Sequence, residues 1–193
     1  MRFDLYTSIH KAQRDHLFQL SIQIGKADFT DPAQVSNVKD RMEHMITHIR
    51  QHALNEETFI HPLFTVCKEQ CEQLDSQHLQ IERLLDELEE IIENNLSDRL
   101  YAVFNRFIAM YLQHTDLEET IQKEALWTNY NDDELKATMH QYSQSLTWQK
   151  TLEGMAFMIP SLNVSEVGKM LSGMKNALPE DKFQQILRIA EQT

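Results

Sequence analysis

Apolar residues recur at spacings of three and four along four long segments in the first two-thirds of the chain. This period places them on one face of a helix. The helices predicted in this way cover about residues 4–26, 31–59, 72–94 and 97–126. Helices of this length joined by short loops predict an all-α fold, an up-down-up-down four-helix bundle.

Residues near the segment ends give further signals. Asp31-Pro32 is a typical start for the second helix, and Ser97 is expected as the N-cap of the fourth. His61-Pro62 is expected to bend or break the second helix, because Pro disfavours the helical conformation at the residue before it.

The pattern changes to shorter segments after residue 127. Asn131 with Glu134, and Asn163 with Glu166, have the spacing of capping boxes, so each pair predicts a helix start. A Leu-Pro pair at 178–179 is expected to open a last helix. We therefore expect two parts, a bundle over residues 1–127 and a helical C-terminal extension over 128–193 that packs on it.

Composition supports a helical protein and argues against some partners. The 193 residues include only 4 Gly and 4 Pro, and the formal net charge of −12 disfavours binding to nucleic acid or to an anionic membrane. No apolar stretch reaches the roughly 18 residues that suggest a transmembrane helix. The first residues carry charges where a signal peptide would be apolar, so we expect a cytoplasmic protein in which Cys67 and Cys71 stay reduced.

Polar residues interrupt the apolar stripe of every long helix. Each helix carries a His, and three of the four carry a Glu four residues later, on the same face. Burying an unpaired polar group costs roughly 2–7 kcal/mol, and metal ions remove that cost. The candidate ligands are His10, His52, Glu56, His78, Glu82, His114 and Glu118.

This donor set predicts the kind of metal. Imidazole and carboxylate donors from four helices are typical of a di-iron or di-manganese carboxylate site in a bundle core. The absence of Cys at ligand spacing favours non-haem iron over structural zinc, with Mn or Zn as substitutes. The sequence contains no Gly-rich phosphate loop, no GxSxG and no CxxC that would indicate other chemistry.

Some neighbouring residues remain alternatives. His16 could replace His10 on the first helix. His44 and His48 precede His52 by two turns and one turn and so lie away from the site, whereas His61 could reach it. On a regular helix Glu118 stays near the stripe of His114 and Glu119 swings off it, but a π-bulge would reverse that choice.

Other residues close to the site also have two interpretations. Glu57 is next to the candidate ligand Glu56, just as Glu119 is next to Glu118, so a shift in helical register would bring Glu57 to the site in place of Glu56. Tyr6 and Tyr111 lie one turn before His10 and His114, where each could be a core residue or a redox-active phenol near iron.

Four segments resemble the hemerythrin-like, or HHE, cation-binding family. They are IHKAQR at His10, RQHALNEETFIHPLF around His52 and Glu56, QHLQIERL around His78, and YLQHTDLEET around His114. The resemblance covers about the first 126 residues, and the extension is similar to that of bacterial proteins in a hemerythrin-domain subgroup.

The resemblance implies an antiparallel four-helix bundle with two iron ions, bridged by an oxo or hydroxo group, that bind dioxygen. It implies that His10, His52, His78 and His114 are terminal ligands and that Glu56 and Glu118 bridge the ions. The oxygen carriers of the family have a second His four residues after the first on the third helix, where this chain has Glu82. An oxygen donor in place of imidazole should favour the ferric state and weaken reversible dioxygen carriage.

Three functions are compatible with these observations. The first is a binding or sensing module for dioxygen or another small diatomic ligand, or for redox state. The second is a di-iron oxidase or peroxide-consuming enzyme, and the third is a helical interaction protein without metal. We favour the first, in the form of a responsive module, because Glu82 in place of the second His argues against a respiratory carrier. The family name alone fixes none of these functions.

Overall fold

The structure is a computed structural model that describes residues 2–66, 68–94 and 98–192, with side chains except at 66, 68–71 and 98. The described residues form helices joined by short connections, which confirms the predicted all-α fold class. The long helices are α1 (Thr7–Lys26), α2 (Pro32–Phe59), α3 (Lys68–Glu93) and α4 (Asp98–Ile121).

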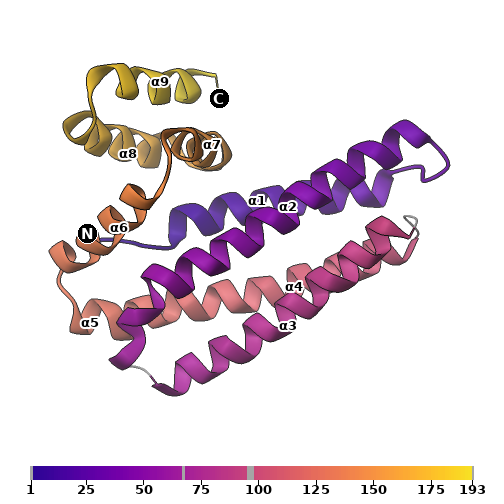
Figure 1. Cartoon of the computed structure of the whole chain (residues 1–193), viewed down its shortest axis with the longest axis horizontal. Coiled ribbons are helices and arrows are strands. Elements are labelled where there is room, and N and C mark those ends of the chain that lie inside the picture. The colour runs from indigo at the N-terminus through magenta and orange to yellow at the C-terminus, as the bar shows by residue number, and fades with distance from the viewer. Residues whose placement is uncertain (1, 67, 95–97, 193) are drawn as a thin grey trace.

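The four long helices lie side by side along one body (Figure 1). Each of α1 and α3 packs against both α2 and α4. The order of the contacts between α1 and α4 is opposite along the two helices. Arg14 Nη2 donates to Thr115 Oγ1 at 2.7 Å, and later in α1 Ser21 Oγ donates to Asn105 Oδ1, which is earlier in α4, at 3.0 Å. The two helices are therefore antiparallel.

The helix ends follow the local sequence. Asp31 is the N-cap of α2, where its carboxylate accepts from the Ala33 N–H at 2.9 Å, and Pro32 takes the first helical position. The predicted break is confirmed at His61, where α2 gives way to the 3₁₀ helix η1 (His61–Val66). The predicted N-cap Ser97 and the residue Cys67 lie outside the described residues, as does the side chain of Cys71.

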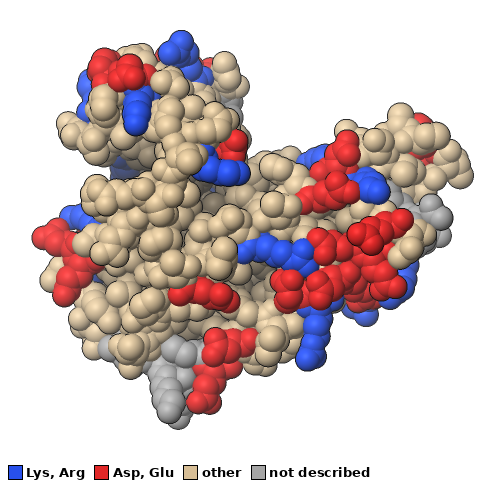
Figure 2. Space-filling model, viewed as in Figure 1, with Lys and Arg blue, Asp and Glu red and all other residues tan. Residues whose placement is uncertain are grey.

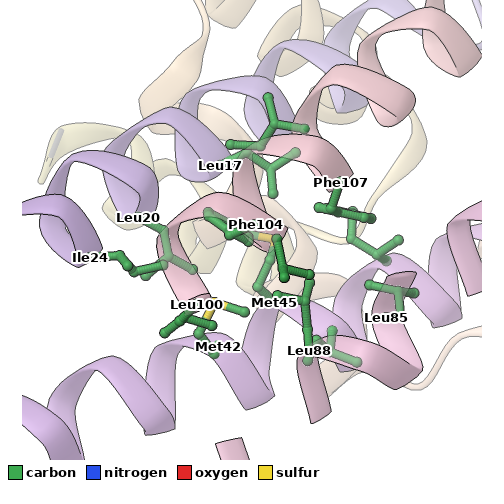
Figure 3. Close-up of a cluster of buried hydrophobic side chains, with 14 of the residues drawn as sticks. Leu17, Leu20, Ile24, Met42, Met45, Leu85, Leu88, Leu100, Phe104 and Phe107 are labelled. Carbon is green, nitrogen blue, oxygen red and sulfur yellow. The ribbon is translucent and has the colours of Figure 1, made fainter. Parts of the chain in front are cut away.

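Two clusters of buried hydrophobic side chains form the bundle core. The larger includes Leu17, Ile49, Ile81 and Tyr111. Figure 3 shows part of this cluster, with Leu17 labelled, between the long helices. The smaller includes Tyr6, Ile60, Leu74 and Ile121. On each long helix, buried polar residues lie in sequence between a member of one cluster and a member of the other. These buried polar residues therefore form a layer between two hydrophobic clusters.

The end of α4 departs from the expected regular helix. A π-helix, η2 (Gln122–Leu126), follows Ile121 and leads into the short α5 (Trp127–Asn129). Gln122 is fully buried; its Oε1 accepts from the Leu5 N–H at 2.6 Å, and its Nε2 donates to Asp4 at 3.1 Å. The π-helix thus holds the N-terminal segment against the bundle.

The C-terminal segments form further helices. Both predicted capping boxes, at Asn131 and Asn163, are present. These elements are α6 (Asp132–Ser145), α7 (Trp148–Met158), the 3₁₀ turn η3 (Ile159–Ser161), α8 (Val164–Ala177) and α9 (Glu180–Glu191). Of these, α7, α8 and α9 lie beside α1 (Figure 1).

The C-terminal helices dock on the bundle mainly through α7 and η3. The ring of Phe157 stacks on His16 of α1 at 4.1 Å and on His48 of α2 at 3.9 Å between ring centroids. Lys11 pairs with Glu166 at 2.6 Å, and Ser161 Oγ donates to Asp15 at 2.9 Å. Phe157 therefore joins the extension to two long helices at once.

The surface of the bundle carries most of its visible acidic residues in one band. Figure 2 shows red side chains gathered over the region of α3, with basic side chains among them. Arg50 alone contacts Glu82, Asp86 and Glu89 there, at 2.6–2.8 Å. Within the described ranges, no helix is both long and apolar enough to cross a bilayer.

Candidate metal centre

Six of the seven ligands expected from the sequence come together in the polar layer of the bundle. They form two groups, and within each group one ligand atom per residue lies within 4.8 Å of all the others. The first group is His10, His52, Glu56 and Glu118, and the second is Glu56, His78, His114 and Glu118. Because both groups contain Glu56 and Glu118, the arrangement is that of two adjacent sites joined by two carboxylates.

Every long helix contributes to these groups, and burial differs among them. The side chains of His10, Glu56, His114 and Glu118 are at most 3% exposed. His52 on α2 and His78 on α3 are 11% and 13% exposed. The layer is therefore closest to solvent between α2 and α3.

The inward-facing atoms approach one another without hydrogen-bond geometry. His52 Nε2 lies 2.9 Å from Glu56 Oε1, and His10 Nε2 lies 3.3 Å from Glu118 Oε2. Neither nitrogen, nor any oxygen of the two carboxylates, has a hydrogen-bond partner among the described residues. Since buried polar atoms are normally satisfied, this convergence is the signature expected of metal ligands that face a common centre.

The two imidazoles of the second group have a related geometry. His78 Nε2 and His114 Nε2 face each other at 3.1 Å. Two nitrogens bound at right angles to one ion, each at about 2.1 Å, would be separated by about 3 Å. The observed separation therefore fits two ligands of the same ion.

The outer ring nitrogens of three candidate ligands have protein partners. His10 Nδ1 contacts Glu119 Oε1 at 3.1 Å, and His114 Nδ1 contacts Gln77 Oε1 at 3.2 Å. His78 Nδ1 lies 3.6 Å from Glu57 Oε1. Such partners fix the ring orientation of metal-binding imidazoles. The sequence analysis did not anticipate a role for Gln77, although its spacing from Leu74 and Ile81 places it on the buried face of α3, because its carboxamide is not among the usual metal ligands.

The electrostatics of the layer reflect buried opposite charges. Burial opposes a charge on His10, but the carboxylates of Glu118, Glu119 and Glu56 outweigh it and hold the His10 pKa well above its usual value. Burial likewise acts to raise the pKa of Glu118, but His114 and His10 outweigh it and hold that pKa well below the usual value. The carboxylates are thus kept in the ionised form that binds cations.

The structure discriminates between several of the alternatives. Glu118 points into both groups, whereas Glu119 contacts the outer nitrogen of His10 and pairs with Arg14 at 2.9 Å. The π-helix begins at Gln122, so the step from His114 to Glu118 remains that of a regular helix. His16 lies apart from both groups, where its Nε2 contacts the Phe157 carbonyl at 3.1 Å.

Other candidates lie around the two groups or away from them. Glu82 is half exposed and pairs with Arg50 at 2.8 Å, so the structure does not bring it to the ligand layer, and we leave it out of the proposed ligand set. His48 stacks on Phe157 and is not a member of either ligand group, and His44 is exposed. His61 stacks on His78 with 5.4 Å between ring centroids, beside the second group.

The fold and the donor set define a cation-binding helical bundle. A family model of the hemerythrin HHE cation-binding domain matches residues 2–126. This match spans more than half of the chain, and the chain belongs to that family. Neither the curated proteins nor the solved structures contain a match.

Proposed function

We propose that this chain is a non-haem di-iron protein that binds or responds to dioxygen or another small diatomic ligand. In this proposal His10 and His52 hold one ion, His78 and His114 hold the other, and Glu56 and Glu118 bridge them. The observation that carries it is that the two groups of potential ligands share both carboxylates.

The donor chemistry supports iron. Four imidazoles and two carboxylates form a mixed nitrogen and oxygen set without thiolate, which suits iron and manganese better than a structural zinc. When bound, a pair of iron ions would supply redox chemistry and Lewis acidity. The chain's part is to hold the ions in a dry layer, because four of the six side chains are almost fully buried.

Burial also restricts the ligand. The least buried candidates, His52 and His78, are only slightly exposed, so the described residues leave little open approach at this layer for a substrate of ordinary metabolite size. A ligand of two or three atoms meets this restriction, which supports a sensor or carrier of small molecules over an oxidase of large substrates.

Metal analysis tests the proposed ligand set. Protein purified from iron-replete cells, or reconstituted without oxygen, should contain about two iron ions per chain. Glu56→Ala should lose both ions, because Glu56 belongs to both groups. Glu82→Ala is the matched control and should keep both. Less than one ion in reconstituted wild-type protein would overturn the proposal.

Optical spectroscopy separates the two kinds of function. Anaerobic ferrous protein should be mixed with dioxygen and followed by absorption. A stable, reversible new band supports ligand binding or sensing. Rapid irreversible oxidation, with turnover of an added substrate or of added peroxide, supports the oxidase or peroxide-consuming alternative instead.

A further inference from the structure

Two polar side chains next to the ligand layer are buried without a partner. Gln13 is completely buried, and both atoms of its carboxamide lack a hydrogen-bond partner among the described residues. Tyr111 is 2% exposed, and its hydroxyl likewise has none within that part of the chain. Leaving such groups unsatisfied is costly, so their retention calls for a hydrogen-bonding occupant.

Both side chains lie on the same side of the ligand layer. Gln13 follows His10 by three residues on α1, and Tyr111 precedes His114 by three on α4. Because α1 and α4 are antiparallel and Arg14 contacts Thr115, position 13 lies opposite about position 116. Gln13 and Tyr111 therefore occupy adjoining turns, between the ligand layer and the larger apolar cluster that contains Leu17 and Tyr111.

Electrostatics connect Tyr111 to the candidate ligands. Burial raises the pKa of the Tyr111 phenol well above its usual value, and the carboxylates of Glu56 and Glu118 raise it further. The phenol is therefore a neutral hydrogen-bond donor, and it interacts electrostatically with both shared carboxylates.

The opposite side of the layer handles a buried amide differently. Gln122 is also completely buried, but its carboxamide accepts from the Leu5 N–H and donates to Asp4. The chain thus satisfies a buried glutamine on that side with its own backbone and leaves Gln13 available. This contrast identifies the side with Gln13 and Tyr111 as the one where a small molecule would be bound.

We propose that Gln13 and Tyr111 bind the small ligand taken up at the metal pair, by donating hydrogen bonds to it. This inference rests on the proposed di-iron function. A phenol and a carboxamide N–H both donate hydrogen bonds, so among ligands of two or three atoms the pair selects those that accept hydrogen bonds. Gln13 and Tyr111 are then specificity-determining residues of the centre.

Azide is the probe for this inference. Iron-loaded ferric protein should be titrated with azide and followed by its charge-transfer absorption. Tyr111→Phe and Gln13→Leu should each weaken azide binding about 10- to 100-fold, the size expected for a hydrogen bond to a charged group, while iron content stays at the wild-type value. Tyr130→Phe is the control, because the Tyr130 hydroxyl donates to the Leu63 carbonyl away from the layer.

A second measurement needs no iron. In metal-free protein, Tyr111→Phe should raise the unfolding midpoint, because it removes a buried hydroxyl that lacks a partner within the described chain. Tyr130→Phe should lower the midpoint, because it removes a hydrogen bond.

The outcomes distinguish a failure of this inference from a failure of the proposed di-iron function. Wild-type protein that fails to hold iron overturns the proposed function, and the inference falls with it. Wild-type protein that holds iron, with unchanged azide affinity in both variants, overturns the inference alone. A lower unfolding midpoint for metal-free Tyr111→Phe would contradict the premise that its hydroxyl is unsatisfied.

Discussion

Adjacent glutamates at the end of α4 have different partners. Glu118 is completely buried and belongs to both ligand groups. Glu119 contacts the outer nitrogen of His10 and the guanidinium of Arg14. One residue of helical rotation, about 100°, therefore separates a candidate bridge from a residue that orients another ligand.

This difference leads to a prediction for two alanine variants. Glu118→Ala should lose both metal ions, because it removes a ligand from each group. Glu119→Ala should keep the stoichiometry but bind metal about 10- to 100-fold more weakly, the usual effect of losing the outer partner of a ligand imidazole. Elemental analysis and titration against a competing chelator measure the two effects. Equal losses would mean that Glu119 also enters the layer.

The convergence of individual candidate ligands was predictable wherever the helix is regular and the starting residue faces inward. The i+4 rule selected Glu56 and Glu118 for this reason. It failed to anticipate the position of Glu82, because an i+4 step advances about 40° beyond a full turn and His78 is already near the edge of its stripe. The partner that holds Glu82 outside, Arg50, comes from another helix, and sequence spacing gives no information about it.

Among the elements, the π-helix after α4 was the hardest to predict from the sequence. Its residue Gln122 is buried and bonded to the N-terminal segment through Leu5 and Asp4. Periodicity predicted a regular helix up to Leu126, because a single π turn leaves no mark in the pattern of apolar residues. The long helices and the break at His61 could be predicted, because they depend on local spacing and on Pro62.

The buried position of Gln122 predicts a measurable loss of stability. Gln122→Ala should lower the free energy of unfolding by about 1–3 kcal/mol, because the buried Leu5 N–H loses its acceptor. Denaturant titration of the metal-free protein measures the change. Gln80→Ala is the control: its exposed side chain hydrogen-bonds to Ser76 alone among the described residues, so we expect almost no change. Similar midpoints for both variants would show that the π-helix does not hold the N-terminus.

At the scale of the whole molecule, His48 connects the C-terminal helices to the candidate ligand layer. This residue precedes His52 by one turn on α2, and its ring stacks on Phe157 of α7. Burial, together with His52, His44 and His16, lowers the pKa of His48 to about 3. The docking of the extension therefore depends on a neutral imidazole.

The low pKa of His48 sets the direction of a pH effect. Unfolded His48 takes up a proton as the pH falls through about 6.5, whereas folded His48 does not until about pH 3. The stability contributed by this neutral ring is complete above pH 6.5 and is lost progressively towards pH 3. His48→Gln should therefore lose less stability than wild type between pH 7 and 4. Parallel curves for the two proteins would contradict the assignment.

Metal should couple the ligand layer to the stability of the whole bundle. Without ions, the buried carboxylates of Glu56 and Glu118 act on each other unfavourably, and each unsatisfied atom carries a desolvation cost. Metal that binds the folded chain at 100 times its dissociation constant adds about 2.7 kcal/mol, or about 5–10 °C in melting temperature for a chain of this length. The two apolar clusters on either side of the layer should keep the metal-free form helical.

Hydrogen exchange should locate this coupling within the bundle. Removal of iron should reduce amide protection most at His52–Glu56 and His114–Glu118, whose side chains form the shared layer. Protection in α9 should change little, because α9 packs against α7, η3 and α8. The comparison needs circular dichroism melting of both forms and exchange read by mass spectrometry. If both forms melted together with identical exchange, a helical interaction protein without metal would explain the fold better, because the polar layer would then contribute to stability without ions.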